Sequence, residues 1–214
     1  MEYPRPEEAN VNPDAHQDNF AFHPHNVYLT LLLFSLSILF FALSGSFIYT
    51  RIQSELPPLR LPWLFLFNTL ILLGSSYTIY LAKQKYLEDD TKGYQNALIY
   101  TIGLSFVFLG LQCVAWYQLF VKQIYIHSDV SAGYLYVISI LHFLHVIAGL
   151  PFLGLFYYRA RKYMKEPVSV LVYFSDPEKR LSLRLLSLYW HFLDAMWIYL
   201  VVFFFVYQMI WDFW

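Results

Sequence analysis

The sequence predicts an all-α integral membrane protein, a bundle of five transmembrane helices, and three observations support this fold class. Of the 214 residues, 58% are hydrophobic and only 14% are charged, which is a membrane composition. Five apolar runs each reach about 20 residues, the length that a helix needs to cross the hydrocarbon core. The segments between the runs are charged or rich in helix-breaking residues. We therefore expect one membrane domain, 26–214, after a polar tail, 1–25.

The five runs follow one another without an internal repeat. They are Asn26–Tyr49, Pro62–Ala82, Ala97–Val121, Gly133–Tyr158 and Leu185–Trp211. The tail before the first run is polar and acidic, contains Pro4, Pro6 and Pro13, and lacks the apolar segment of a cleavable signal peptide. We expect this tail to be extended.

Each connection between the runs carries a signal that ends a helix. Pro57-Pro58 follows the first run, and the Glu88-Asp89-Asp90 cluster follows the second. Ser128-Asp129 follows the third run. The longest connection, Arg159–Arg184, includes Val168–Phe174, which is apolar but too short to span a membrane. We expect this segment to lie on the membrane surface or against a partner protein.

Lysine and arginine predict the orientation, because cytoplasmic loops carry an excess of these residues. Eleven lie on the face shared by the N-terminus and the second and fourth connections: Arg5, Lys83, Lys85, Lys92, Arg159, Arg161, Lys162, Lys165, Lys179, Arg180 and Arg184. The other face has Arg51, Arg60 and Lys122. The N-terminus is therefore predicted inside and the C-terminus outside. Four tryptophans at or near the outer helix ends, as in an interfacial aromatic belt, support the helix boundaries independently: Trp63, Trp116, Trp211 and Trp214.

Charge and cysteine content exclude several classes of protein. The net charge of −1, without a long basic block, gives no electrostatic basis for binding nucleic acid. The one cysteine, Cys113, has no second cysteine with which to form a disulfide or a CxxC site. We expect neither a nucleic-acid partner nor a redox-active thiol pair.

Four polar side chains are predicted to share one layer near the middle of the membrane: Asn68, Gln112, His142 and His145. Within the fourth run, His142 and His145 are three residues apart and occupy one face, so we expect both to point at the same neighbour. Polar side chains at such depth commonly hydrogen-bond across helices, at about 0.6–2 kcal/mol per pair. Interhelical contact is the first interpretation of this layer.

Metal or haem ligation and ion transport are weaker interpretations of the same residues. Two histidines one turn apart cannot supply opposite axial ligands to one haem, and His191 alone does not provide a second pair. A non-haem metal would need more ligands at the same level, and Asp194 is several ångströms away from it. A proton or ion path usually shows a chain of carboxylates, whereas only one lies at depth.

His191 and Asp194 stand within the last apolar run, where an ionisable residue costs about 2.5–3.5 kcal/mol on insertion scales. They are three residues apart and share a helix face, with Trp190 and Trp197 nearby. One interpretation is a His–Asp contact that stabilises the helix. The other is a pocket in which these groups and basic loop residues hold a phospholipid headgroup while aromatic rings line its tails.

Four motifs in these runs resemble subunit III of the haem-copper cytochrome c oxidases. Tyr189-Trp190-His191-Phe192-Leu193-Asp194 with Trp197 is similar to the Tyr-Trp-His-Phe-Val-Asp signature in the last helix of that family. The other three motifs are Asn68-Thr69 before Ser75-Ser76-Tyr77-Thr78, Gln112 with Trp116, and Leu141-His142-Phe143-Leu144-His145-Val146-Ile147-Ala148-Gly149. They occur in the family's order on four different helices, and the resemblance covers Phe22 to about Trp211.

The resemblance is to the short, five-helix bacterial form, and it implies a specific role. The chain would be a non-redox accessory subunit in the inner membrane, without a catalytic centre, cofactor or metal site of its own. Haem and copper would lie in subunit I, against which the chain packs, with subunit II and small subunits alongside and phospholipid bound. It would support proton uptake and protect the oxygen-reducing site. Ser37 and Ala115 stand where relatives often carry glutamate, and His23-Pro24-His25 resembles the start of short relatives.

Alternatives from other classes remain open at this point. The chain could accompany a quinol oxidase or a nitric oxide reductase, because the electron donor is bound by other subunits. It could be a haem-binding membrane anchor, which would show a Soret band on the isolated chain. The haem type of the partner, the lipid species and membership of a respiratory supercomplex are not encoded in these motifs.

Overall fold

A computed structural model describes residues 24–54, 62–164 and 166–213, and throughout these ranges the regular structure is helical. The helices are α2 (Pro24–Ser54), α3 (Leu64–Leu87), α4 (Thr91–Val121), α5 (Val130–Tyr163), α6 (Pro167–Ser175) and α7 (Pro177–Phe213). All but α6 are long and apolar enough to cross a membrane. The predicted fold class, five transmembrane helices, is confirmed.

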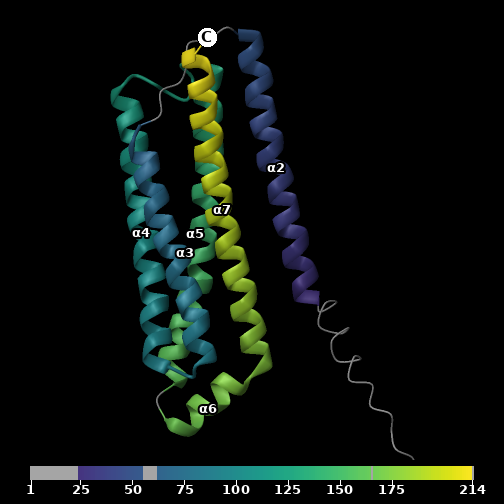
Figure 1. Cartoon of the computed structure of the whole chain (residues 1–214), viewed down its shortest axis with the longest axis vertical. Coiled ribbons are helices and arrows are strands. Elements are labelled where there is room, and N and C mark those ends of the chain that lie inside the picture. The colour runs from purple at the N-terminus through teal and green to yellow at the C-terminus, as the bar shows by residue number, and fades with distance from the viewer. Residues whose placement is uncertain (1–23, 55–61, 165, 214) are drawn as a thin grey trace, which may run out of the picture.

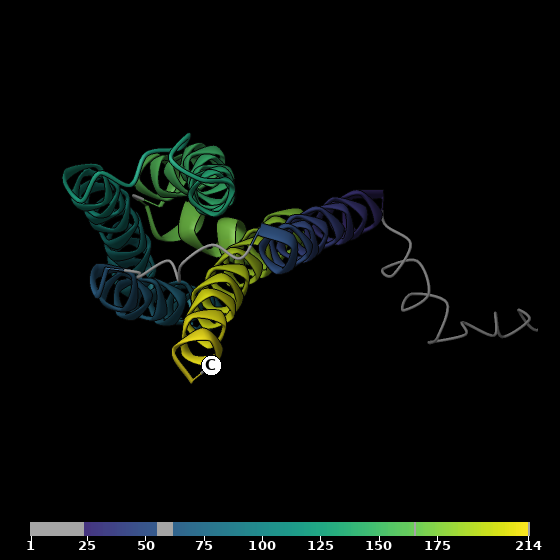
Figure 2. The same cartoon turned by 90° about the horizontal axis from the view of Figure 1, so that it is seen from above.

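The five long helices run side by side along one axis (Figures 1 and 2). Helices α3 and α4 form the most extensive pair, and α7 packs against α3 and α5. Helix α2 stands at the edge of the bundle, where it contacts α5 and α7. Because five spans are an odd number, α2 begins at one end of the bundle and α7 finishes at the other (Figure 1). Helix α6 lies across the end at which α2 begins.

Acidic residues in two connections cap the helices that follow them. The Asp90 carboxylate accepts a hydrogen bond from the Gly93 amide at 2.9 Å, at the start of α4. Asp129 accepts one from the Ala132 amide at 2.8 Å, at the start of α5. Each cap satisfies an amide that has no partner within its helix. In the tight turn before α4, Asp89 takes a positive φ of 57°, a conformation that aspartate tolerates better than most residues.

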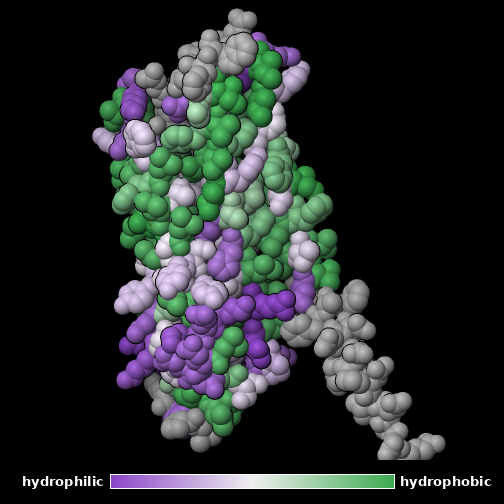
Figure 3. Space-filling view, viewed as in Figure 1, coloured by the Kyte–Doolittle hydropathy of each residue, from purple (hydrophilic) through white to green (hydrophobic). Residues whose placement is uncertain are grey.

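Two hydrophobic clusters form the interior. One surrounds Trp197 and draws residues from all five long helices, and the other surrounds Tyr86 and Trp190 nearer to α6. The outer surface of the helices is apolar as well, and Figure 3 shows hydrophobic side chains over much of the visible face. Hydrophilic side chains gather toward the end that carries α6. Helices that are apolar all round are expected where lipid replaces water as the surroundings.

The fourth connection differs from the prediction. Residues 159–184 were expected to be a loop, but α5 continues to Tyr163 and α7 already begins at Pro177. Apolar run length measures the part of a helix that crosses hydrocarbon, whereas the backbone of a helix continues past the lipid into water. The ends of the helices therefore could not be read from hydropathy.

The Val168–Phe174 segment forms most of α6, and it packs against its own chain. The Tyr86 hydroxyl donates to the Tyr173 carbonyl at 3.0 Å, and the ring centroids of Tyr86 and Phe174 are 5.0 Å apart. Tyr173 and Phe174 are buried, while Leu171 and Val172 face outward. One face of α6 thus contacts α3, and the other face is exposed; its expected position on the membrane surface or against a partner protein stays a prediction.

Some expectations fall on residues outside the described ranges. These are the tail up to His23, the Pro57-Pro58 connection, the cations Arg60 and Lys165, and Trp214. Of the predicted tryptophan belt, Trp63 lies just before α3 with 77% of its surface exposed.

Candidate polar seam between the transmembrane helices

The face of α7 that carries the family-like motif packs against small hydroxyl residues of α3. The Trp190 indole N–H donates to the Ser75 hydroxyl at 3.0 Å, and Trp190 is 1% exposed. About two helical turns further along α7, the Trp197 indole N–H donates to the Thr69 hydroxyl at 3.2 Å. Serine and threonine leave room for the large rings and supply the acceptors that buried indoles need.

His191 and Asp194 are both turned toward Ser76 of α3. The His191 Nδ1 and the Ser76 hydroxyl are hydrogen-bonded at 2.7 Å, and the Ser76 side chain also interacts with the Asp194 carboxyl group. Asp194 is 3% exposed, and its Oδ2 has no hydrogen-bond partner among the described residues. The two ionisable side chains therefore both lie near Ser76 at the α3–α7 interface, and His191 is hydrogen-bonded to it.

Asn68 and Gln112 meet across the α3–α4 interface. The Asn68 side-chain amide donates to the Gln112 carbonyl oxygen at 3.0 Å, and both residues are fully buried. An amide pair of this kind satisfies one donor and one acceptor that would otherwise be exposed to hydrocarbon. It joins the two helices in the middle of the bundle.

The histidines of α5 contact different helices, contrary to the expectation of a shared neighbour. The His142 ring is fully buried, with its centroid 6.0 Å from Phe108 of α4 and 5.0 Å from Trp197 of α7. His145 instead donates from Nδ1 to the carbonyl of Leu141 at 2.6 Å, and its ring lies 6.3 Å from Phe40 of α2. A spacing of three residues is 300° of helical rotation, which leaves the two side chains about 60° apart.

Trp116 joins α4 to α5. Its indole N–H donates to the Ser139 hydroxyl at 3.1 Å, and its ring centroid lies 4.9 Å from that of Phe143. The neighbouring Ala115 is fully buried in the bundle. Ser37 of α2 is half-buried and donates to the carbonyl of Leu33 at 2.9 Å. Ala115 thus places a methyl group in the interior, and the Ser37 hydroxyl is satisfied by a carbonyl of its own helix.

Gly149 allows α5 and α7 to approach closely. A Cβ atom at this position would lie 2.8 Å from Cζ3 of Trp190 and 3.0 Å from Cε1 of Tyr189. The Tyr189 hydroxyl also donates to the carbonyl of His145 at 2.9 Å. Only a residue without a side chain fits beside the tryptophan at this distance.

Arg51 is a buried cation that sequence reasoning did not identify. It lies near the end of α2 and is 1% exposed. Its Nε donates to the Tyr207 hydroxyl at 2.7 Å, its Nη1 donates to the Ser131 hydroxyl at 2.8 Å, and its guanidinium lies over the Tyr207 ring at 5.2 Å. An arginine at the end of an apolar run is usually interfacial, so the sequence carried no signal for this burial.

Within the described ranges, no three histidine, cysteine, aspartate or glutamate side chains gather in a way that could hold a metal ion. Of the predicted polar residues, the structure brings Asn68 together with Gln112, and His191 and Asp194 together around Ser76. His145 lies apart from both groups, against α2.

Comparison with known proteins supports the family resemblance that the four motifs indicate. The family model for cytochrome c oxidase subunit III matches residues 26–211. Cytochrome c oxidase subunit 3 of Thermostichus vulcanus is 29% identical over 187 residues, which cover 83% of this chain and 86% of that protein. The Bos taurus protein of the same name is 31% identical over 147 residues, covering 69% of this chain and 50% of that protein.

A third relative, cytochrome c oxidase subunit 3 of Tachyglossus aculeatus aculeatus, is 31% identical over 149 residues, covering 70% of this chain and 51% of that protein. The chain thus spans about half the length of the Bos and Tachyglossus relatives and most of the Thermostichus one. The family model covers all five long helices, including the four that carry the motifs. The chain belongs to the cytochrome c oxidase subunit III family.

Proposed function

We propose that this chain is a non-redox accessory subunit of an aerobic haem-copper terminal oxidase, in which it packs on subunit I. The observation that carries the proposal is the match of residues 26–211 to the subunit III family, together with the position of its motifs. Trp190 and His191 contact α3, and Gln112 contacts Asn68. The residues of the motifs thus lie at the interfaces between helices, and a subunit that acts as a scaffold requires such contacts.

The contacts of the histidines favour scaffolding over haem binding. Nδ1 of His145 is engaged by a carbonyl of its own helix, and Nδ1 of His191 by Ser76. The His142 ring lies between two aromatic rings on α4 and α7. These rings diverge to different neighbours, whereas a haem with two histidine axial ligands would need two of them on opposite sides of one plane. Haem and copper, in this proposal, belong to subunit I.

The proposed roles of the polar residues follow from these contacts. Asn68, Gln112, Trp116, His142 and His145 join the helices at mid-depth. Trp190, His191 and Asp194, with cations nearby, shape a phospholipid site. Through these contacts the chain would sustain proton uptake into subunit I and protect the oxygen-reducing site during turnover.

We place the chain in the inner membrane of a bacterium, with the basic end of the bundle and α6 on the cytoplasmic side. The excess of lysine and arginine at that end supports this orientation. Subunit II, small subunits and a larger respiratory supercomplex would be neighbours of the assembled oxidase.

The test is to tag the chain in its host, extract it in mild detergent, and record a reduced-minus-oxidised spectrum with mass spectrometry of the co-purifying proteins. Haem signals that accompany large oxidase subunits, and disappear when the chain is purified alone, would support the proposal. A haem signal that stays with the isolated chain would replace it with a haem-binding anchor. The identity of the co-purifying subunits would separate a cytochrome c oxidase from a quinol oxidase or a nitric oxide reductase.

A further inference from the structure

Exposed aromatic side chains mark two levels along helices α3 and α4. On α3, Trp63 is 77% exposed and Tyr80 is 48% exposed, and the two are 17 residues apart. On α4, Tyr117 is 67% exposed and Tyr100 is 63% exposed, again 17 residues apart. Seventeen residues of helix rise about 26 Å, close to the hydrocarbon thickness of about 30 Å. Because tyrosine and tryptophan gather at the headgroups, Tyr80 and Tyr100 mark the level at which these helices leave the hydrocarbon on the α6 side.

Helix α6 packs beyond that tyrosine level. The Phe174 ring centroid lies 5.0 Å from that of Tyr86 on α3 and 6.4 Å from that of Tyr94 on α4. Tyr86 is six residues past Tyr80, and Tyr94 is six residues from Tyr100 toward the same end. Six residues of helix rise about 9 Å, whereas the headgroup layer adds about 5–8 Å to each side of the hydrocarbon. These distances favour a position of α6 outside the lipid, across the end of the bundle (Figure 1).

The outward face of α6, which consists of Leu171 and Val172, is apolar. Their side chains are 66% and 63% exposed, while Tyr173 and Phe174 are buried against the bundle. None of the nine residues of α6 is charged. A helix that is apolar on every face is normally buried, and water is an unfavourable surrounding for neighbouring leucine and valine side chains. With lipid out of reach, the cover that suits this face is the apolar surface of a protein.

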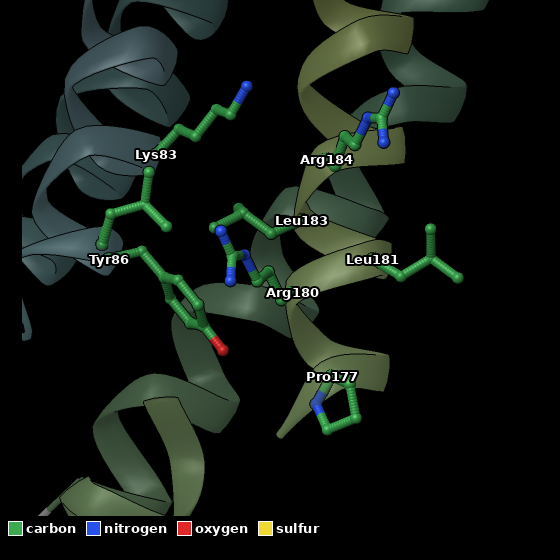
Figure 4. Close-up of a pocket in the computed structure, with 8 residues that line it drawn as sticks. Lys83, Tyr86, Pro177, Arg180, Leu181, Leu183 and Arg184 are labelled. Atoms are coloured by element: carbon green, nitrogen blue, oxygen red, sulfur yellow. The ribbon is translucent and has the colours of Figure 1, made fainter. Parts of the chain in front are cut away.

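The surroundings of α6 carry an excess of positive charge. Beyond the tyrosine level, the described residues comprise nine cations, Lys83, Lys85, Lys92, Arg159, Arg161, Lys162, Lys179, Arg180 and Arg184, and six anions, Glu88, Asp89, Asp90, Glu166, Asp176 and Glu178. Arg161 and Arg180 are exposed. Figure 4 shows Arg180 reaching from α7 toward α3, where Lys83 lines the same cavity. Electrostatic complementarity favours carboxylates on whatever docks here and disfavours a second copy of this chain, which would bring the same cations face to face.

We propose that the outward face of α6 is a docking site for an extramembrane segment of another protein, one that presents apolar side chains flanked by aspartate and glutamate. The apolar side chains cover Leu171 and Val172, and the carboxylates meet the surrounding cations, Arg161 among them. Two side chains make a small apolar centre, so this contact adds to a larger interface. The inference goes beyond the proposed function, because it depends on the position and charge of α6 and not on which complex the chain joins.

The test places the photo-reactive amino acid benzoylphenylalanine at position 172 of the tagged full chain, expressed in its own host. Membranes are irradiated, the chain is purified, and mass spectrometry identifies the attached molecule and, for a protein, the attached peptide. The expected result is a cross-link to one segment of one protein. That segment should lie outside the membrane spans of its protein and contain more aspartate and glutamate than lysine and arginine.

Substitutions then connect this cross-link with the chemistry of the face. Leu171→Gln should lower its yield about tenfold, because a leucine would no longer be buried at the contact. The matched control is Leu87→Gln, at the same end of the bundle and also more than half exposed, which should leave the yield unchanged. Arg161→Glu should lower the yield, whereas Arg161→Lys, which keeps the charge, should retain it.

Attachment of a phospholipid at position 172 would overturn the proposal and place α6 on the membrane surface. Attachment to a second copy of this chain, or to no molecule, would overturn it as well, and so would a protein cross-link that Leu171→Gln leaves unchanged. The oxidase assignment is tested separately by the haem-containing subunits that co-purify with the unsubstituted chain. Either proposal can therefore fail while the other holds.

Discussion

Replacing Gly149 by alanine should loosen the contact between α5 and α7. The added Cβ would stand 2.8 Å from Cζ3 of Trp190, well inside the contact distance of two carbon atoms. The Trp190 ring has little freedom to move, because it is 1% exposed and its indole N–H is hydrogen-bonded to Ser75 at 3.0 Å. Overpacking of this kind costs about 1–3 kcal/mol of stability.

Gly154, on the same helix, is the matched control, because nothing lies within 4 Å of the Cβ that alanine would add there. Both substitutions gain about 0.5–1 kcal/mol from the better helix propensity of alanine, so this contribution cancels in the comparison. The Gly149→Ala variant should then be less stable than the Gly154→Ala variant by about 1–3 kcal/mol.

The assay is reversible unfolding of the purified protein in mixed micelles with a rising fraction of denaturing detergent, followed by tryptophan fluorescence. The Trp190→Phe variant, alone and with Gly149→Ala, completes a double-mutant cycle. Because phenylalanine lacks the Cζ3 atom that alanine would strike, part of the cost should be recovered in the double variant. If the two alanine variants unfold together, the close approach of α5 and α7 is not as described.

Three further outcomes are expected. Changing Asn68 or Gln112 alone to leucine should cost about 1–3 kcal/mol, because the remaining amide is left buried without its partner, and changing both should cost less; detergent unfolding of the three variants measures this. Arg51→Met should release the end of α2 from α5 and α7, which would appear as faster proteolysis of the chain near that end, while exposed Lys122→Met should not. The Lys179 ammonium, through its hydrogen bond, holds the pKa of the Asp176 carboxyl below the ordinary value of 3.8. Because the folded pKa is lowered, this stabilisation is complete above the ordinary value and is lost as the pH falls through the lowered one. The protection factor for hydrogen exchange of residues 167–175, in which the pH dependence of intrinsic exchange is divided out, should therefore fall below about pH 4 in the parent and stay level in Asp176→Asn.

The number of membrane spans and the family could be predicted from the sequence, and the ends of the helices could not. Five apolar runs of about 20 residues leave few alternatives, since a membrane accepts only segments that satisfy their own backbone. Helix α7, however, begins at Pro177, eight residues before the predicted Leu185. Hydropathy measures where side chains prefer lipid, whereas a helix ends where its backbone hydrogen bonds end.

The polar residues of the site could be listed from the sequence, but their partners could not. Depth along each helix was enough to place Asn68 and Gln112 in one layer, and the structure joins them at 3.0 Å. It was not enough to show that His142 and His145 contact different helices, or that α6 packs on Tyr86.

The sequence by itself determined the class of the protein, its five spans and its family, because these depend on composition, run length and local motifs. Only the tertiary structure decided that His191 is hydrogen-bonded to Ser76, that Asp194 is buried beside the same interface and that Arg51 is buried. It also brought Lys83 of α3 and Arg180 of α7 to one cavity. The physical reason is that a periodic pattern specifies which face of a helix a side chain occupies, whereas packing between helices specifies which residue of another helix lies opposite that face.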